Sequence, residues 1–225
     1  MLKTITITLF LIALAGQTQG AESCRAEDFV KAEYQIHINK TNRAKRNTKL
    51  ILWRKGTTVA HQYPATQISE AWQHISSKKQ LIKPIRYFEA HKRAIEYQPG
   101  EVVHGKKEND WSYRAQLVSD TLLNSMTLTQ QSGSGCDEVQ TFTKNTGNKQ
   151  MSLKWFSKRK LVKSFQISTK HSTETWHLKS VDNNQQTIKA YFKTLDSYQT
   201  TDFADIGDDH TDHFLTNMVT LGFIE

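Results

Sequence analysis

The chain has 225 residues, of which 37% are hydrophobic and 23% are charged, and its formal net charge is +8 at pH 7. This composition is typical of a globular protein and excludes a largely disordered chain. The charge is uneven, because residues 182–225 contain eight acidic residues and two lysines, which leaves residues 21–181 with +13. Such a basic region favours an anionic partner, although lysines also serve simply to solubilise exposed strand faces.

The first 20 residues have the order of a cleavable signal peptide. Lys3 is followed by an apolar run from Ile5 to Leu14 and then by small and polar residues through Gly20. The apolar run is about ten residues long, whereas a bilayer span takes roughly 20. We therefore expect residues 1–20 to be removed, after Gly20 or Ala21, and the mature chain to be a soluble periplasmic protein with no transmembrane anchor.

The sequence contains two cysteines, Cys24 and Cys136. In an oxidising compartment an even number of cysteines favours a disulfide, which here would fix the start of the mature chain. One alternative is a redox or metal-binding thiol pair, for which the usual Cys-x-x-Cys spacing is missing. The other is lipid attachment at Cys24, which the nearby charge of Glu22 disfavours.

Alternation of apolar and polar residues predicts strands in the first third of the mature chain. Residues 34–38 alternate in this way, and we expect the basic residues 39–49 to form a loop. Residues 50–53 and 57–63 are two β-rich runs that flank Gly56, which predicts a hairpin.

The middle of the chain mixes strand and helix signals. Residues 85–88 and 93–97 predict a second hairpin, and residues 68–75 fit either a strand or a short helix. Residues 111–118 place apolar side chains at every second position and predict a strand. A short helix capped by Ser119 is expected to follow, through residue 126.

The clearest pattern lies after Cys136. Four strand-like runs separated by short turns predict an antiparallel meander, at residues 139–143, 150–156, 161–168 and 174–181. Two segments of the acidic C-terminal region carry further signals. Residues 188–192 fit a strand or the start of a helix, and residues 211–221 have helical periodicity.

A meander of this length must hide one face of its sheet. We predict a mainly β fold, in which a curved antiparallel sheet forms a half-barrel or barrel-like meander with a few short helices, one of them C-terminal. Residues 21–225 would form one domain, with an acidic and partly helical segment at 182–225. Export, length and strand rhythm over residues 30–195 resemble the LolA-type half-barrel of periplasmic lipoprotein carriers and related lipid-binding proteins.

The LolA-type resemblance implies an apolar cavity lined by aromatic side chains. The residues of this kind that could line it and bind a ligand are Trp53, Trp72, Tyr87, Trp111, Trp155 and Trp176. The alternative is that they fill the core, where aromatic residues on strands usually lie.

A cluster of acidic residues and histidines near the C-terminus is a candidate metal site. His210 and His213 would share one face of a helix, and Asp209 and Asp212 could complete a divalent-metal site. The alternative is that the acids cap the helix and interact with its positive end.

The sequence contains no recognisable catalytic signature, because neither a Gly-x-Ser-x-Gly elbow nor a Gly-rich phosphate loop is present. We predict a non-enzymatic periplasmic protein that binds an amphipathic or anionic envelope ligand, or a partner protein, without a cofactor. The alternatives are a divalent-metal-binding protein or metal-dependent enzyme that uses residues 208–213, and an envelope assembly factor that acts through protein contacts. After export, nucleic acid is not an expected partner.

Overall fold

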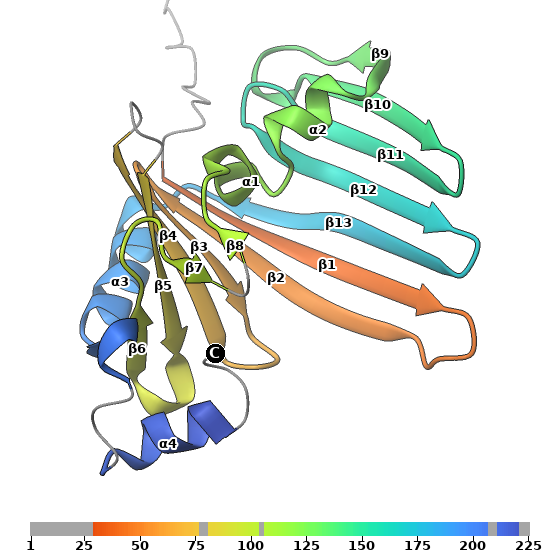
Figure 1. Cartoon of the computed structure of the whole chain (residues 1–225). Helices are drawn as coiled ribbons and strands as arrows, with labels where there is room; N and C mark the ends of the chain where they lie inside the picture. Colours follow the sequence, from red (N-terminus) through yellow and green to blue (C-terminus); the bar gives the residue numbers. More distant parts are fainter. Residues whose placement is uncertain (1–28, 77–80, 104–105, 207–210, 221–225) are drawn as a thin grey trace, which may run out of the picture.

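The dominant feature of the protein is one 12-stranded sheet (Figure 1). The computed structural model describes residues 29–76, 81–103, 106–206 and 211–220. The sheet is curved and does not close, because β14 and β9 form its two edges. Its strands are β1 (Val30–Lys40), β2 (Arg46–Lys55), β3 (Thr58–Tyr63), β4 (Ile68–Ser76), β5 (Leu81–Phe88), β6 (Arg93–Glu96), β9 (Thr127–Ser132), β10 (Val139–Thr146), β11 (Lys149–Phe156), β12 (Leu161–Thr169), β13 (Ser172–Asp182) and β14 (Gln199–Asp202).

Short helices and a small hairpin complete the described part of the chain. None of the described helices is long and apolar enough to span a membrane. These elements are the strands β7 (Val102–Val103) and β8 (Lys106–Lys107), the helices α1 (Trp111–Gln116), α2 (Asp120–Asn124), α3 (Gln185–Asp196) and α4 (His213–Thr220), and the 3-10 turns η1 (Glu89–His91), η2 (Gly135–Asp137) and η3 (Phe203–Asp205).

Two meanders are joined side by side in this sheet. The strand order is β14-β6-β5-β4-β3-β2-β1-β13-β12-β11-β10-β9, so the first meander, β1 to β6, meets the second, β9 to β13, where β1 pairs with β13. All neighbours are antiparallel except β14 and β6, because α3 carries the chain back across the sheet before β14 begins. The predicted mainly β, curved antiparallel fold with few short helices is confirmed.

Much of the basic stretch at residues 39–49 is strand, where the sequence predicted a loop. β1 continues to Lys40 and β2 begins at Arg46, so the connection is a tight turn in which Asn42 has a φ of 61°. Asparagine tolerates this left-handed conformation better than most residues. The charged residues at these strand ends are exposed. Because these polar side chains stay in water, the backbone pairing of β1 with β2 can continue into the basic sequence.

The segment 111–118, predicted to be a strand, begins with helix α1. The carboxylate of Asp110 accepts a hydrogen bond from the Tyr113 backbone N–H and caps the helix. Trp111 and Ala115, one helical turn apart, then pack together against a buried cluster on β3, β4 and β5. The period-two pattern was misleading because the alternation of Trp111, Tyr113, Ala115 and Leu117 is also compatible with a short capped helix.

The two faces of the sheet carry separate cores. α3 covers one face with Ile188, Phe192 and Leu195, which pack against β2, β4, β5 and β6. α1 lies on the other face over β3 to β5, and α2 and the residues that follow the two helices lie on that face over β1, β2 and β11 to β13 (Figure 1). A fourth cluster around Ile95 and Leu215 joins α4 to the end of β6.

Candidate functional site

An apolar row crosses the sheet from β1 to β9. Strand register places six residues directly opposite one another on neighbouring strands, on the face that carries α2. The row is Ile36, Trp176, Phe165, Leu153, Phe142 and Leu128. Cross-strand neighbours of this kind lie within contact distance of one another, so the row forms a continuous surface.

Burial along this face is incomplete. Ile36, Phe165 and Leu153 are buried, but Phe142 and Trp176 are only half-buried, and Leu128 is 47% exposed. We call the partly exposed set the open face. It consists of Ile38, Leu128, Phe142, Ile167, Trp176 and Leu178.

Trp176 is held in a fixed position on the open face. Its indole Nε1 donates a hydrogen bond to the Glu174 carboxylate at 2.6 Å, and its ring meets the Tyr34 ring edge-on at 6.3 Å between centroids. A tryptophan whose polar atom is already satisfied offers its remaining exposed surface for apolar contacts.

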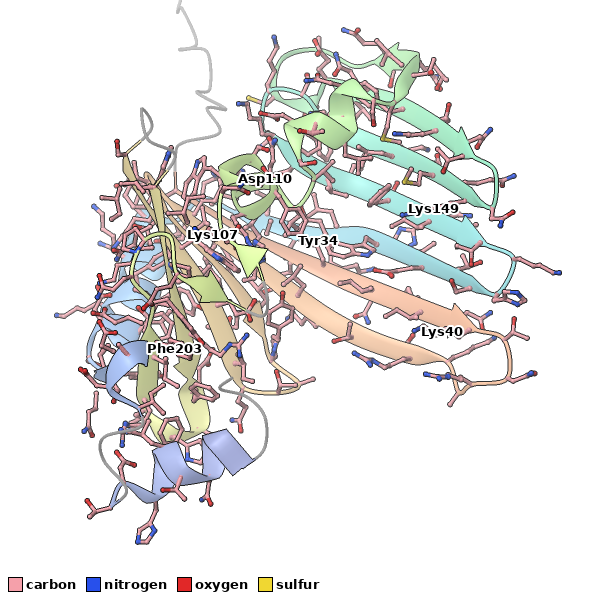
Figure 2. The ribbon with its side chains drawn as sticks, viewed as in Figure 1. Tyr34, Lys40, Lys107, Asp110, Lys149 and Phe203 are labelled. Carbon is pink, nitrogen blue, oxygen red and sulfur yellow. The ribbon has the colours of Figure 1, made fainter. Side chains whose placement is uncertain are left out.

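The open face ends at a row of cationic residues. Lys40 lies at the end of β1 and Lys149 at the start of β11, and Figure 2 shows both at the same end of the sheet. The turns β1–β2, β10–β11 and β12–β13 all lie at this end, as the pairings of Lys40 with Ser172 and of Lys149 with Thr169 require. We call the exposed cations there the basic rim, which consists of Lys40, Arg43, Lys45, Arg46, Lys149 and Lys170.

The basic rim is unneutralised by the described part of the chain. None of its six members forms an ion pair with another described residue. Residues 34–69 and 139–173 contain no acidic residue at all, and together they supply every member of the rim. Exposed cations gathered at one edge create a local positive potential that attracts anions and weakens as salt is added.

The other face of the same strands is polar. In β11 the burial alternates strictly from Met151 to Trp155, so Ser152 and Lys154 are exposed on the side opposite Leu153. His37 and His177 lie exposed on the polar side of β1 and β13. The apolar character of these strands is therefore confined to one face.

A charged pocket of about 520 Å³ lies elsewhere, between β4, β5 and the segment before α1. Its cations are matched by acids, since Arg86 pairs with Glu70 at 2.6 Å and Arg114 pairs with Glu108 at 2.5 Å. The Arg114 guanidinium also lies 4.0 Å from the centroid of the Trp72 ring. Because these charges neutralise one another, the pocket lacks the excess charge of the basic rim.

His61 is buried next to this pocket. Its Nε2 donates a hydrogen bond to the Arg114 carbonyl oxygen at 2.8 Å, and its ring meets Trp72 edge-on. Burial lowers the pKa of His61 to about 4, so the ring is neutral at physiological pH.

The six aromatic residues predicted to line a cavity are distributed over both faces of the sheet. Trp53 and Tyr87 pack beneath α3, and the Trp53 ring stacks on Tyr191 at 3.9 Å. The other four lie on the opposite face, where Trp72 and Trp111 contact one cluster and Trp155 and Trp176 another. The structure thus brings Trp155 and Trp176 into the core that borders the open face, and it separates Trp53 and Tyr87 from it.

Only half of the predicted metal cluster lies in the described residues. Asp209 and His210 lie outside them, whereas His213 begins α4. The Asp212 carboxylate pairs with Arg93 at 2.6 Å and accepts the backbone N–H of Phe214, which holds its pKa below the usual range. Within the described ranges no group of three potential metal ligands is found, so a metal site stays a prediction.

One of the two cysteines of the predicted disulfide lies in the described residues. Cys136 lies in η2, where its carbonyl oxygen accepts a hydrogen bond from Arg159 Nε at 3.0 Å. Cys24 and the whole predicted signal peptide lie outside the described residues, so both the disulfide and export stay predictions.

Comparisons with known proteins give only distant likenesses. No protein family model matches the chain, and no curated protein matches it. Among solved structures, PNGF-II in two crystal forms is similar with TM-scores of 0.42 and 0.41 at 8% and 7% identity, over 78% and 77% of this chain. The chain spans 31% of the length of each PNGF-II chain.

Two further solved structures are matched over a larger share of their own chains than PNGF-II is. A LolA superfamily protein from Nitrosomonas europaea has a TM-score of 0.33 at 7% identity, over 73% of this chain and 90% of that one. The Pseudomonas aeruginosa MucA/MucB complex has a TM-score of 0.35 at 7% identity, over 74% of this chain and 57% of that one. The LolA superfamily, which the sequence resembles, is thus among the matched structures.

Proposed function

We propose that this protein is a non-enzymatic binding protein for an anionic amphiphile. The apolar chain of the ligand lies on the open face, and its anionic group lies at the basic rim. The observation that carries this proposal is that the partly exposed open face extends towards the end of the sheet where six cations gather, none of which forms an ion pair in the described chain. We further propose that the protein acts in the periplasm after export.

The apolar part of the proposal is based on the incomplete burial of the open face. Phe142, Ile167 and Trp176 are half-buried, and Leu128 is 47% exposed. Covering apolar surface stabilises a complex by about 25 cal/mol per Å², or about 0.8 kcal/mol for each buried methylene. An acyl chain of ordinary length therefore supplies enough free energy to compensate for the entropy lost on binding.

The electrostatic part accounts for the choice of an anionic rather than a neutral ligand. A single exposed ion pair contributes little, but six neighbouring cations raise the local concentration of anions together. The lysines on the polar face of the same strands, such as Lys154 and Lys179, lie opposite the open face and cannot reach the same ligand.

Matched lysolipids separate the two contributions. We would measure binding by isothermal titration calorimetry, below the critical micelle concentrations, with lysophosphatidylglycerol, lysophosphatidylcholine and glycerophosphoglycerol. The first two have the same acyl chain and differ in head-group charge, and the third lacks the chain. We expect lysophosphatidylglycerol to bind most tightly and to lose affinity with added salt. We expect glycerophosphoglycerol to bind most weakly.

Two sets of variants locate the ligand. Trp176→Ala should weaken the binding of both lysolipids, whereas Lys45→Glu combined with Arg46→Glu should weaken only that of the anionic one. The matched control is Lys154→Glu combined with Lys179→Glu, which makes the same charge change on the polar face and should have a small effect. Failure of the unmodified protein to bind either lysolipid would overturn the proposal. Equal losses in the rim and control variants would remove the basic rim from it.

A further inference from the structure

Arg54, near the end of β2, is a buried cation without a carboxylate partner in the described chain. The residue is only 2% exposed. Its Nη1 and Nη2 donate to the carbonyl oxygens of Lys160 and Arg159 at 3.3 and 2.9 Å, and its Nε has no partner. Two neutral carbonyl groups satisfy part of its hydrogen-bonding capacity, but they do not neutralise its charge.

Arg86 is also buried but, unlike Arg54, it has a carboxylate partner among the described residues. Arg86 is 8% exposed and pairs with the Glu70 carboxylate at 2.6 Å. Burying a charge without a counter-charge is costly, and buried charges in proteins are normally paired for that reason. Burial accordingly lowers the pKa of Arg54 to about 10, so the guanidinium is still charged at neutral pH.

Arg54 lines a pocket of about 550 Å³, which is within the range of small-ligand sites. The pocket lies between α1, the β2–β3 turn, the end of β4 and the β11–β12 turn. Lys160 contributes a second cation, Thr57 and Gln116 contribute polar groups, and Trp111, stacked on His74, contributes an aromatic wall.

Asp120 is the acidic residue of this pocket, and it is already engaged. One of its carboxylate oxygens accepts a hydrogen bond from Gln116 Nε2 at 2.5 Å. It forms no ion pair with Arg54 in the described structure. With Arg54 and Lys160 against Asp120, the side chains that line the pocket leave an excess of positive charge.

We propose that this pocket binds a small organic anion, whose carboxylate or phosphate group lies between Arg54 and Lys160 and whose flat apolar part lies against Trp111. The site is separate from the proposed lipid site, because it lies at the opposite end of β2 and β11 from the basic rim. The hydrogen bonds of Arg54 to the β11–β12 turn position the guanidinium and leave its charge for the ligand.

Benzoate and phenyl phosphate, with benzyl alcohol as the neutral analogue, test this proposal. We would titrate each into the purified protein by calorimetry at constant ionic strength. The expected result is saturable binding of at least one anion and none of the alcohol. Inorganic phosphate and acetate, which lack the ring, should bind more weakly than their aromatic counterparts. Absence of saturable binding by either aromatic anion would overturn the proposal.

Variants in one turn provide the matched pair. Lys160→Asn removes the charge at a residue with a φ of 46°, a conformation that asparagine tolerates. It should weaken anion binding about tenfold, as expected for loss of one charged hydrogen bond. Lys158→Asn, in the same turn but outside the pocket, should have no effect. Equal effects of the two variants would contradict the proposal.

Arg54→Met should abolish anion binding. If that variant does not fold, the proposal is tested with Gln116→Leu and Lys160→Asn, which should weaken anion binding. Neither variant removes the hydrogen bonds of Arg54 to the turn. Lysophosphatidylglycerol binding should be unchanged in Lys160→Asn. The experiments thus test the pocket and the proposed lipid site separately. Loss of both anion binding and lysophosphatidylglycerol binding in Lys160→Asn would show that they are one site.

Discussion

The two halves of the sheet bury their side chains in different ways. In β2, five consecutive residues from Leu50 to Arg54 are buried, because α3 covers one face and the residues that follow α1 cover Leu50 and Leu52 on the other. β11 begins with two exposed residues, Lys149 and Gln150. Buried and exposed residues then alternate from Met151 to Trp155. We call β2–β6 with β14 the inner sheet, and β1 with β9–β13 the outer sheet.

This difference in burial suits the inner sheet to stability and the outer sheet to binding. The inner sheet is the middle layer of a three-layer structure, so Trp53 and Tyr87, which pack beneath α3, contribute to stability rather than to a binding surface. The outer sheet has one polar face and one apolar face that is only partly covered by α2. A partly covered apolar face costs stability, and proteins usually retain such a face because it binds something.

Trp53→Ala is the strongest test of the inner sheet. The Trp53 ring stacks on Tyr191 at 3.9 Å, and its Nε1 donates to the Gln62 side chain at 3.1 Å. We expect the free energy of unfolding to fall by about 3–5 kcal/mol, because the substitution leaves a cavity and an unpaired amide. Urea unfolding followed by circular dichroism measures it. A loss below about 1 kcal/mol would mean that α3 is not firmly packed on the sheet.

Acid should also destabilise the inner sheet through His61. The pKa of this buried histidine is lowered to about 4, whereas in the unfolded chain it is near 6.5. Between these values the unfolded state binds a proton that the native state does not, so stability present above pH 6.5 is lost as the pH falls. The shift corresponds to about 3 kcal/mol between pH 7 and pH 4.

His61→Gln isolates this effect from the titration of the carboxylates. Glutamine can still donate to the Arg114 carbonyl oxygen but does not titrate. We expect the loss of stability between pH 7 and pH 4, measured by urea unfolding, to be smaller in the variant than in the unmodified protein. An identical loss in the two proteins would contradict the assignment of His61 as the buried neutral base.

Much of the fold, but little of the site, could be predicted from the sequence. Strands β10 to β13 were predicted because each has its own apolar alternation and its own turns. β9 was missed because all six of its residues are exposed and leave no apolar pattern. β14 was missed because it is four residues long and is defined only by its parallel pairing with β6.

The open face depends on pairings between distant parts of the chain. Ile36 meets Trp176 only because β1 pairs with β13, and no local pattern gives that register. Trp176 itself was among the predicted ligand-binding residues, but so was Trp53, which lies on the other face under α3. The basic residues of the rim were evident in the sequence, whereas their convergence at one edge required the hairpin geometry.

Phe142→Ala tests whether the open face is more loosely packed than the inner core. Phe142 lies opposite Leu153 on one side and Leu128 on the other, and it is half-buried. We expect a loss of about 1–2 kcal/mol in urea unfolding, clearly less than for Trp53→Ala, because part of its surface is already in water. A loss as large as that of Trp53→Ala would show that this face belongs to the core and would remove the contrast between the two halves.

The smallest effect on stability is expected at the basic rim. Lys45→Gln combined with Arg46→Gln removes two exposed cations that form no ion pair with any described residue. Exposed substitutions of this kind change the free energy of unfolding by less than about 0.5 kcal/mol. Here the sign should be stabilising at low salt, because neighbouring like charges repel one another, and the gain should vanish as salt screens them. Urea unfolding at low and high salt measures this. A clear destabilisation would mean that the rim is bound to acidic groups of the chain itself, and it would then have no excess charge to offer a ligand.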